Sequence, residues 1–247
     1  MGIIETKDFG VRYGEKVIFS DANIDIPTGR FLAILGENGA GKTSFVKALI
    51  GQNVQTVGQL SRQTKRIGFV PQFRDITRDY PLQISEFVGL TFNRGWRLWW
   101  NTKEKQAIQA ALSRMDLLAI ADQRLGLVSG GQKQRAFVAQ ALVQQPDLLI
   151  LDESTASLDH EHKVQLLKTV QQLQKEQQLT ILFITHELKL ISQFADGYLL
   201  FENGRVTQGD KVALQALTKQ MTHMHEAHVH EENEVHDVKN SLPAGGS

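Results

Sequence analysis

The sequence contains no cysteine and only five prolines among its 247 residues. Without thiols the chain forms no disulfide, has no zinc finger and uses no thiol nucleophile, which suits a reducing compartment. It also lacks an apolar run near the roughly 20 residues that a membrane-spanning helix needs. The N-terminus has no basic region followed by an apolar one, so we predict no signal peptide and expect a partner to bring the chain to a membrane.

Neither sign of charge dominates the sequence. The 27 Lys and Arg residues balance the 27 Asp and Glu residues. Nucleic-acid-binding domains are usually basic, so the neutral balance argues against nucleic acid as a partner. The apolar share of 41% is ample for the core of one large domain, or of one domain with a subdomain.

Strand and helix patterns alternate through the first 220 residues. Short alternating runs in residues 1–30 predict antiparallel strands. Continuous apolar strands are predicted at 30–35, 66–70, 147–152 and 180–185, and helices at 43–51, throughout about 75–145, and at 162–177. Residues 198–209 predict a hairpin with Asn203 and Gly204 at its turn. Strands that alternate with helices indicate an α/β fold with a mainly parallel sheet.

The stretch "GENGAGKT", residues 36–43, lies between a predicted buried strand and a helix, and is called the phosphate loop below. Gly36, then four residues, then Gly41-Lys42-Thr43 is the spacing of a loop that binds phosphate. Glycines let backbone N–H groups turn toward anionic oxygens, and the helix start adds its positive dipole end. We expect Lys42 to reach the outer phosphates and Thr43 to ligate Mg²⁺. The alternative is a tight turn without a ligand.

A pair of carboxylates supports the phosphate-binding interpretation. Asp152 and Glu153 end the buried strand "LLILDE", where adjacent negative charges are costly unless a cation compensates them. Asp152 is the expected outer ligand of Mg²⁺, and Glu153 is placed to orient or deprotonate a water that faces the γ-phosphate. The alternative role for "DES" is the cap of a following helix.

A second anion site is predicted at "SGGQ", residues 129–132. A hydroxyl and bare amides at a helix N-terminus attract anions, although the same residues could simply cap that helix. Three further polar or aromatic residues carry similar alternatives. Tyr13 could be an ordinary strand aromatic, Gln72 a turn residue and His186 a helix cap.

Together these motifs resemble the nucleotide-binding subunit of the ATP-binding cassette (ABC) transporters, over residues 3 to about 218. The resemblance implies a P-loop NTPase core with an N-terminal antiparallel β subdomain and an inserted helical subdomain, in a domain spanning residues 1–220. It implies ATP and Mg²⁺ as cofactors, and it assigns nucleotide contacts to Tyr13, Gly36, Glu37, Asn38, Gly39, Ala40, Gly41, Lys42, Thr43, Ser44, Gln72, Ser129, Gly130, Gly131 and Gln132. The implied Mg²⁺ ligands are Thr43, Gln72 and Asp152, and the implied catalytic residues are Glu153 and His186.

The resemblance has further consequences and two departures. It implies that two cassettes pair head to tail around ATP, that residues 157–159 communicate between them, and that separate transmembrane permease subunits dock on the helical region. In that region, "NRGWRLWW" is either core or contact surface. The family usually has Leu where Val128 stands and Pro where Ser154 stands. Neither departure removes a phosphate ligand.

The stretch 221–247 loses apolar periodicity and is predicted to be a mobile tail. Its histidines, mixed with glutamates, suit Zn²⁺ and related ions; they are His223, His225, His228, His230 and His236. The cassette is similar to the zinc and manganese uptake group, which implies an ATPase of a metal importer at the cytoplasmic face of the membrane, with an extracellular metal-binding protein as a further partner. The alternative functions are an importer of another solute, such as a metal chelate or cobalamin, a soluble cassette that acts on nucleic acid or ribosomes, and a non-hydrolysing binding module, which Glu153 and His186 argue against. The alternative for the tail is a solvated segment without a role.

Overall fold

The strands form two sheets in the computed structural model of the chain, which describes residues 2–72, 76–92, 99–152 and 159–220. One sheet is antiparallel and lies in the N-terminal part, with β1 (Ile4–Tyr13), β2 (Lys16–Ala22), β3 (Asp25–Ile26) and β5 (Gln55–Arg62). Its order is β2-β1-β3, and β5 also pairs with β1. The antiparallel N-terminal strands are therefore confirmed, whereas β5 was not predicted.

The second sheet contains six strands in the order β10-β9-β4-β8-β7-β6. They are β4 (Phe31–Gly36), β6 (Ile67–Val70), β7 (Leu148–Asp152), β8 (Thr180–Ile184), β9 (Gly197–Glu202) and β10 (Arg205–Asp210). All neighbouring pairs are parallel except β9 and β10, which form the predicted hairpin. Its turn residues, Asn203 and Gly204, have φ of 50° and 72°, the conformation that this short turn requires.

The helices are α1 (Lys42–Leu49), α2 (Ile84–Gly89), α3 (Thr102–Arg114), α4 (Gly130–Leu142), α5 (His160–Gln177) and α6 (Leu188–Ile191), followed by a helix at residues 211–220. The prediction of helix throughout 75–145 was wrong, because this region contains the separate helices α2, α3 and α4. Asn101 and Ser129 cap new helices, and Asp116, at φ 53°, follows the end of α3. The apolar spacing continues across these boundaries, but the capping residues and the left-handed residue end one helix and start the next.

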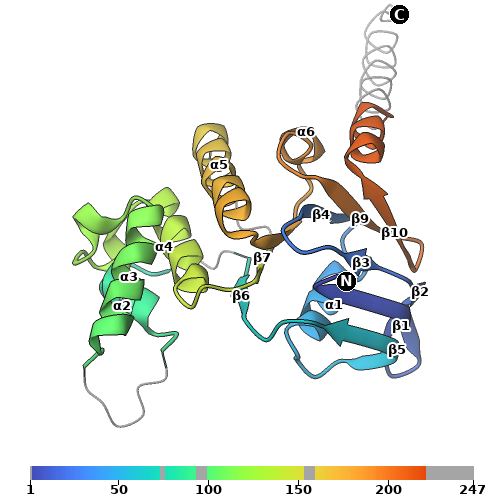
Figure 1. Cartoon of the computed structure of the whole chain (residues 1–247), viewed down its shortest axis with the longest axis horizontal. Helices are drawn as coiled ribbons and strands as arrows, with labels where there is room; N and C mark the ends of the chain where they lie inside the picture. The colour runs from blue at the N-terminus through green and yellow to red at the C-terminus, as the bar shows by residue number, and fades with distance from the viewer. Residues whose placement is uncertain (1, 73–75, 93–98, 153–158, 221–247) are drawn as a thin grey trace, which may run out of the picture.

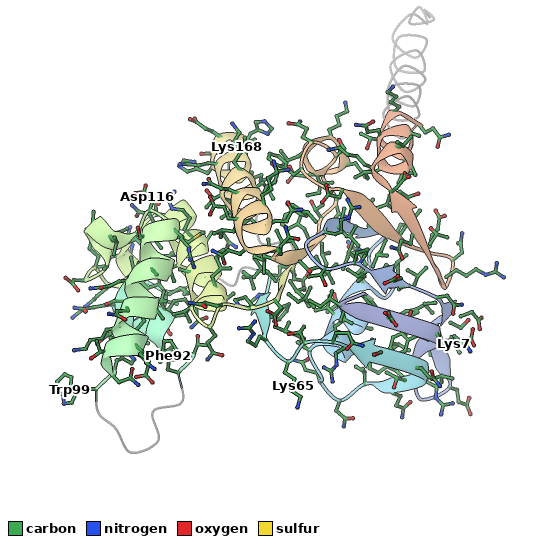
Figure 2. The ribbon with its side chains drawn as sticks, viewed as in Figure 1. Lys7, Lys65, Phe92, Trp99, Asp116 and Lys168 are labelled. Atoms are coloured by element: carbon green, nitrogen blue, oxygen red, sulfur yellow. The ribbon has the colours of Figure 1, made fainter. Side chains whose placement is uncertain are left out.

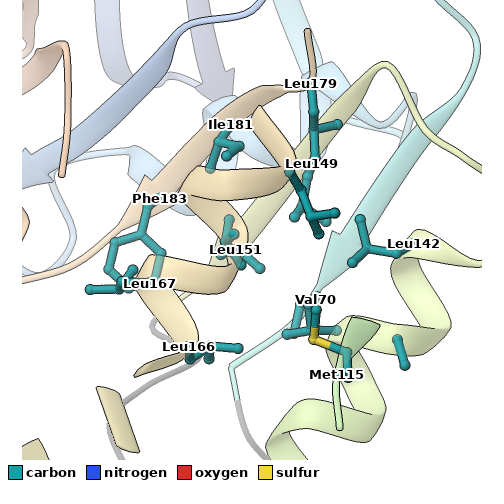
Figure 3. Packing of buried hydrophobic residues seen from close by; sticks show 14 of the residues in the cluster. Val70, Met115, Leu142, Leu149, Leu151, Leu166, Leu167, Leu179, Ile181 and Phe183 are labelled. Carbon is teal, nitrogen blue, oxygen red and sulfur yellow. The ribbon is translucent and has the colours of Figure 1, made fainter. Parts of the chain in front are cut away.

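Side chains on the two faces of the parallel sheet pack into different layers. Phe31, Ala33 and Leu35 of β4 belong to the cluster that contains α2 to α5, while Leu32 and Ile34 belong to the cluster that contains α1 and the antiparallel sheet. This alternation follows from the two-residue period of a strand. Figure 3 shows the first cluster, where leucines of β7 and α5 pack together. Both faces are buried, which explains the continuous apolar strands in the sequence.

The helical region and the antiparallel sheet lie on opposite sides of the parallel strands (Figure 1). The carboxyl ends of β4, β8 and β7 are level, because Ile34 pairs with Ile184 and Ile184 pairs with Asp152. Residues that follow these strands therefore meet at one edge of the sheet, where open α/β sheets bind ligands. Among the described residues, none of the helices has both the length and the apolar character needed to cross a bilayer.

Candidate functional site

The phosphate loop joins β4 to α1, and its backbone requires glycine at two positions. Gly36 has φ 135°, and a Cβ there would lie 2.3 Å from the carbonyl oxygen of Phe201. Gly41 has φ 109°, and its Cβ would lie 2.8 Å from Cγ2 of Ile18. Any side chain at either position would push the loop away from the sheet or the β1–β2 hairpin.

Lys42 is buried, and its ammonium group lies inside the curve of the loop. Its Nζ atom donates hydrogen bonds to the carbonyl oxygens of Gly36 at 2.6 Å and Glu37 at 2.8 Å. Helix α1 begins at the same residue, with no side-chain hydrogen bond from its N-cap Gly41 and no acidic residue in its first turn. A positive charge and a helix N-terminus therefore converge there, as an anion site requires.

A cavity of about 400 Å³ opens in front of the loop. Its described lining residues are Ile18, Asn38, Gly39, Gly41, Lys42, Thr43, Ser44, Gln72, Asp152 and Ile184. The size suits a small-molecule ligand, and nothing lies within 4 Å of the position that a Cβ on Gly39 would take. The loop backbone is therefore accessible to a phosphate group.

Three oxygen-bearing side chains of this cavity fit a magnesium ion. Thr43 supplies a hydroxyl, Gln72 an amide and Asp152 a carboxylate, from the loop, the end of β6 and the end of β7. Hard divalent cations prefer oxygen donors, and Mg²⁺ is commonly held by one carboxylate together with phosphate oxygens. The structure thus brings together the three residues that the sequence proposed as metal ligands.

Tyr13 ends β1 at the side of the loop. Its ring is 45% exposed, and its hydroxyl lies 3.4 Å from Oγ of Ser44 in the first turn of α1. An exposed aromatic face beside a phosphate site can stack on a base. Tyr13 is both a strand aromatic and a neighbour of the loop, so its contact with adenine stays a prediction.

His186 follows β8 but does not line the cavity in front of the loop. It lines a second cavity of about 500 Å³, together with Gly36, Glu37 and Ala40 of the loop. His186 thus lies at the expected edge of the sheet, but neither cavity has it in the same lining as Asp152 and Gln72. Its contact with the γ-phosphate stays a prediction.

The "SGGQ" stretch forms the start of α4 and lies apart from the phosphate-loop cavity, whose described lining includes none of its residues. Ser129 caps the helix, and its hydroxyl accepts a hydrogen bond from the backbone N–H of Gln132 at 3.2 Å. The alternative role of these residues, capping of α4, is therefore confirmed in this structure. Capping leaves the other amides of the first turn available to an anion.

Several predicted residues fall outside the described ranges. They are Glu153, residues 154–158, Trp96 and the tail histidines. Asp159 is described and caps α5, accepting a hydrogen bond from the backbone N–H of His162 at 3.0 Å. This bond, with one from the His162 ring, lowers the pKa of the Asp159 carboxyl.

Two apolar residues of the cavity were missed by the sequence analysis. Ile18 reaches it from β2, and Ile184 from the end of β8. Both lie in continuous apolar runs of their strands, so no local pattern distinguishes them from core positions. They give the polar cavity an apolar wall.

Residues 19–156 match the protein family described as ABC transporter. The chain belongs to the ABC transporter family. It is 31% identical over 207 residues to a zinc import ATP-binding protein ZnuC of Jannaschia sp., covering 83% of this chain and 81% of that protein. It is 29% identical over 215 residues to the petrobactin import ATP-binding protein FpuD of Bacillus anthracis, covering 82% of this chain and 79% of the relative.

The fold agrees with solved ABC structures. A chain of a metal-chelate type ABC transporter in an inward-facing conformation aligns with a TM-score of 0.77 at 26% identity, covering 86% of this chain and 85% of that chain. The expected P-loop NTPase core and antiparallel subdomain are thus confirmed. This ABC chain is an ATP-binding subunit and an ATPase, as its family membership indicates.

Proposed function

We propose that this ATPase powers the uptake of a divalent metal ion, zinc or manganese, across the cell membrane. The proposal that ATP hydrolysis powers uptake rests on one observation: Lys42, Thr43 and Asp152 line the same cavity at one edge of the sheet. The metal is supported by the similarity to proteins named for zinc import, and by the histidines and glutamates of the tail. The cassette is then a peripheral protein of the cytoplasmic face, and an extracellular metal-binding protein delivers the ion.

In the proposed mechanism ATP binds in front of the phosphate loop. The loop amides and Lys42 bind its phosphates, while Tyr13 stacks on the adenine. Bound Mg²⁺, held by Thr43, Gln72 and Asp152, would neutralise phosphate charge. Glu153 orients the attacking water and accepts its proton, and His186 contacts the γ-phosphate.

We propose that hydrolysis requires two copies of the chain. The described lining of the cavity contains a single cationic side chain, that of Lys42, which offsets only part of the charge of a triphosphate. The start of α4 in a second copy supplies amides that stabilise the remaining charge. ATP therefore holds the pair together, and its hydrolysis releases them, which gives the permease two alternating states.

The permease is proposed to dock on the helical region. Trp99 is 80% exposed there and lies at the outer edge of the helical region (Figure 2). Trp100 instead packs on Gly89, where an added Cβ would lie 2.3 Å from the indole ring. Trp99 is proposed as part of the contact because the family resemblance places the permease on this region and its side chain is exposed there.

A second candidate is the import of a metal chelate or another solute. It is favoured by the similarity to a petrobactin import protein and to a chain of a metal-chelate type transporter. The same cassette chemistry would serve either cargo, because the cavity binds nucleotide and makes no contact with the solute. The permease and the binding protein would then decide between free ion and chelate.

Uptake of radioactive zinc and manganese tests the proposal in cells that carry the chain, its permease and its binding protein. We expect uptake of the free ion, and loss of that uptake in Lys42→Ala, because the phosphate contacts disappear. Lys47→Ala is the matched control, since Lys47 lies on the same helix with an exposed side chain. Uptake of a chelate alone, with no uptake of either free ion, would favour the second candidate.

A further inference from the structure

The second cavity shares the phosphate loop with the nucleotide cavity but is lined by other residues of it. Its volume is about 500 Å³, and its lining is mainly apolar, from β4, β9, α6 and the helix at 211–220. The apolar lining residues are Leu35, Ala40, Leu188, Leu200, Phe201 and Leu217. Nothing in the proposed nucleotide chemistry uses this space, apart from His186, which lines it.

The phosphate loop lines both cavities. Gly36, Glu37 and Ala40 face the second cavity, while Asn38, Gly39 and Gly41 to Ser44 face the nucleotide cavity. The carbonyl groups of Gly36 and Glu37 also accept hydrogen bonds from Lys42. An occupant of the second cavity would therefore contact the phosphate loop and His186 together.

One segment of this chain starts at the mouth of the second cavity. The helix at 211–220 is held to the core by Leu214, which is fully buried, and its residues Leu217 and Gln220 line the cavity. The 27 residues of the tail follow Gln220 directly. At about 3.3 Å per residue they can reach every part of the cavity. The tail offers apolar side chains for it, namely Val229, Val235, Val238 and Leu242.

Charge makes this docking depend on metal. The tail contains five acidic residues and one lysine, a net excess of four negative charges when its histidines are neutral. The cavity rim carries the exposed carboxylates Glu37 and Glu202. A metal-free tail is repelled from this rim, whereas each bound divalent cation cancels two negative charges. Within the described ranges no group of three His, Asp or Glu side chains could hold a metal ion, and the proposed ligands are the histidines and glutamates of the tail.

We propose that the metal-loaded tail, residues 221–247, docks in the second cavity and slows ATP hydrolysis. The docked tail confines His186 away from the γ-phosphate and stabilises the loop in its nucleotide-free form. The imported ion thus limits its own uptake once it accumulates beside the cassette. The identity of the ion, though not the docking, rests on the proposed import function.

The first test measures Mg·ATP hydrolysis by the purified full chain while zinc is added. We expect zinc to slow hydrolysis by about tenfold, within the usual range for coupling between two sites. A chain ending at Gln220 should keep its rate, because it lacks the metal ligands and the docking segment. Equal slowing of both chains would overturn the proposal, since zinc would then act at the nucleotide site.

A matched pair of variants tests the cavity itself. Leu217→Glu adds a carboxylate inside the apolar lining and should abolish the zinc effect, while zinc binding by the tail and the zinc-free rate persist. Val212→Glu, on the same helix with a 73% exposed side chain, should leave the zinc effect intact. If Leu217→Glu does not fold, Glu202→Gln tests the repulsion between the tail and the cavity rim. The variant removes one negative charge from the rim, so inhibition should need less zinc. Unchanged zinc inhibition in whichever variant folds would contradict docking in this cavity.

Docking can also be observed without measuring activity. Because the chain lacks cysteine, Lys189→Cys beside the cavity and Ser241→Cys in the tail can be labelled with a fluorescent donor and acceptor. Energy transfer should rise when zinc is added and should not rise when Leu217→Glu is also present. No rise in the parent pair would refute docking, even if zinc uptake by cells and zinc-free hydrolysis both agree with the proposed function.

Discussion

Ser129 and Gln132 hydrogen-bond to each other across the first turn of α4. The backbone N–H of Ser129 donates to Oε1 of Gln132 at 2.9 Å, and the backbone N–H of Gln132 donates to Oγ of Ser129 at 3.2 Å. This reciprocal pair is a capping box. The two residues expected to contact ATP in a second copy therefore already have a structural role in the isolated chain.

The capping role and the ATP role of Ser129 can be separated by substitution. Ser129→Ala should lower the free energy of unfolding by about 1 kcal/mol, because the cap is lost. Ser129→Asp keeps a capping oxygen and should preserve stability, but it places a negative charge where the γ-phosphate approaches. We expect Ser129→Asp to prevent ATP-dependent pairing, measured by light scattering with Mg·ATP. Pairing at the parent level would show that α4 does not contact the nucleotide.

Glu153→Gln should retain ATP binding but lose most hydrolysis. The amide cannot accept the proton of the attacking water, so the chain should accumulate as an ATP-bound pair. Size-exclusion chromatography and phosphate release measure the two effects. Glu161→Gln, in the first turn of α5, is the control and should hydrolyse ATP normally. Normal hydrolysis by Glu153→Gln would show that another group activates the water.

Trp99 and Trp100 are adjacent in sequence, but their substitution by alanine should have different effects. Trp99→Ala removes an exposed side chain and should leave thermal stability unchanged while weakening association with the permease. Trp100→Ala empties the space beside Gly89 and should cost about 2 kcal/mol of unfolding free energy. Chemical unfolding and co-purification of the permease measure the two effects. Full permease binding by a folded Trp99→Ala chain would place the docking surface elsewhere.

Asp147, directly before β7, should contribute to the free energy of unfolding at neutral pH, and this contribution should be lost in acid. Hydrogen bonds from Arg66 and then Thr64 lower the pKa of the Asp147 carboxyl, with Thr64 Oγ1 at 2.6 Å from Asp147 Oδ2. A folded-state pKa below the unfolded one means that unfolding takes up protons. The contribution is complete above the unfolded pKa, roughly 4, and disappears as pH falls through the folded value.

Asp147→Asn tests this linkage by chemical unfolding over a pH series. We expect the variant to be less stable than the parent near neutral pH, with a difference that shrinks below about pH 4. Asp122→Asn removes an exposed carboxylate from a turn and serves as the control. A stability loss that stays the same at every pH would mean that packing, rather than the ionised carboxylate, supports this strand pair.

The sequence alone determined most strands and the phosphate loop. Strands such as β4 and β8 are buried on both faces and so leave a continuous apolar run, which needs no tertiary information to detect. The loop is recognised equally locally, because the spacing of Gly36, Gly41, Lys42 and Thr43 lies within eight residues. The atoms that exclude a side chain at its glycines are distant in sequence, since they belong to Phe201 for Gly36 and to Ile18 for Gly41.

Tertiary structure alone decided which cavity each functional residue lines. Asp152 and His186 both follow buried strands, and no sequence pattern distinguishes them, yet they line different cavities. Likewise, Trp99 and Trp100 are neighbours in sequence, but only Trp100 finds space against Gly89. The physical reason is that periodicity records whether a residue is buried within its own element, whereas the space it faces depends on how distant elements pack around it.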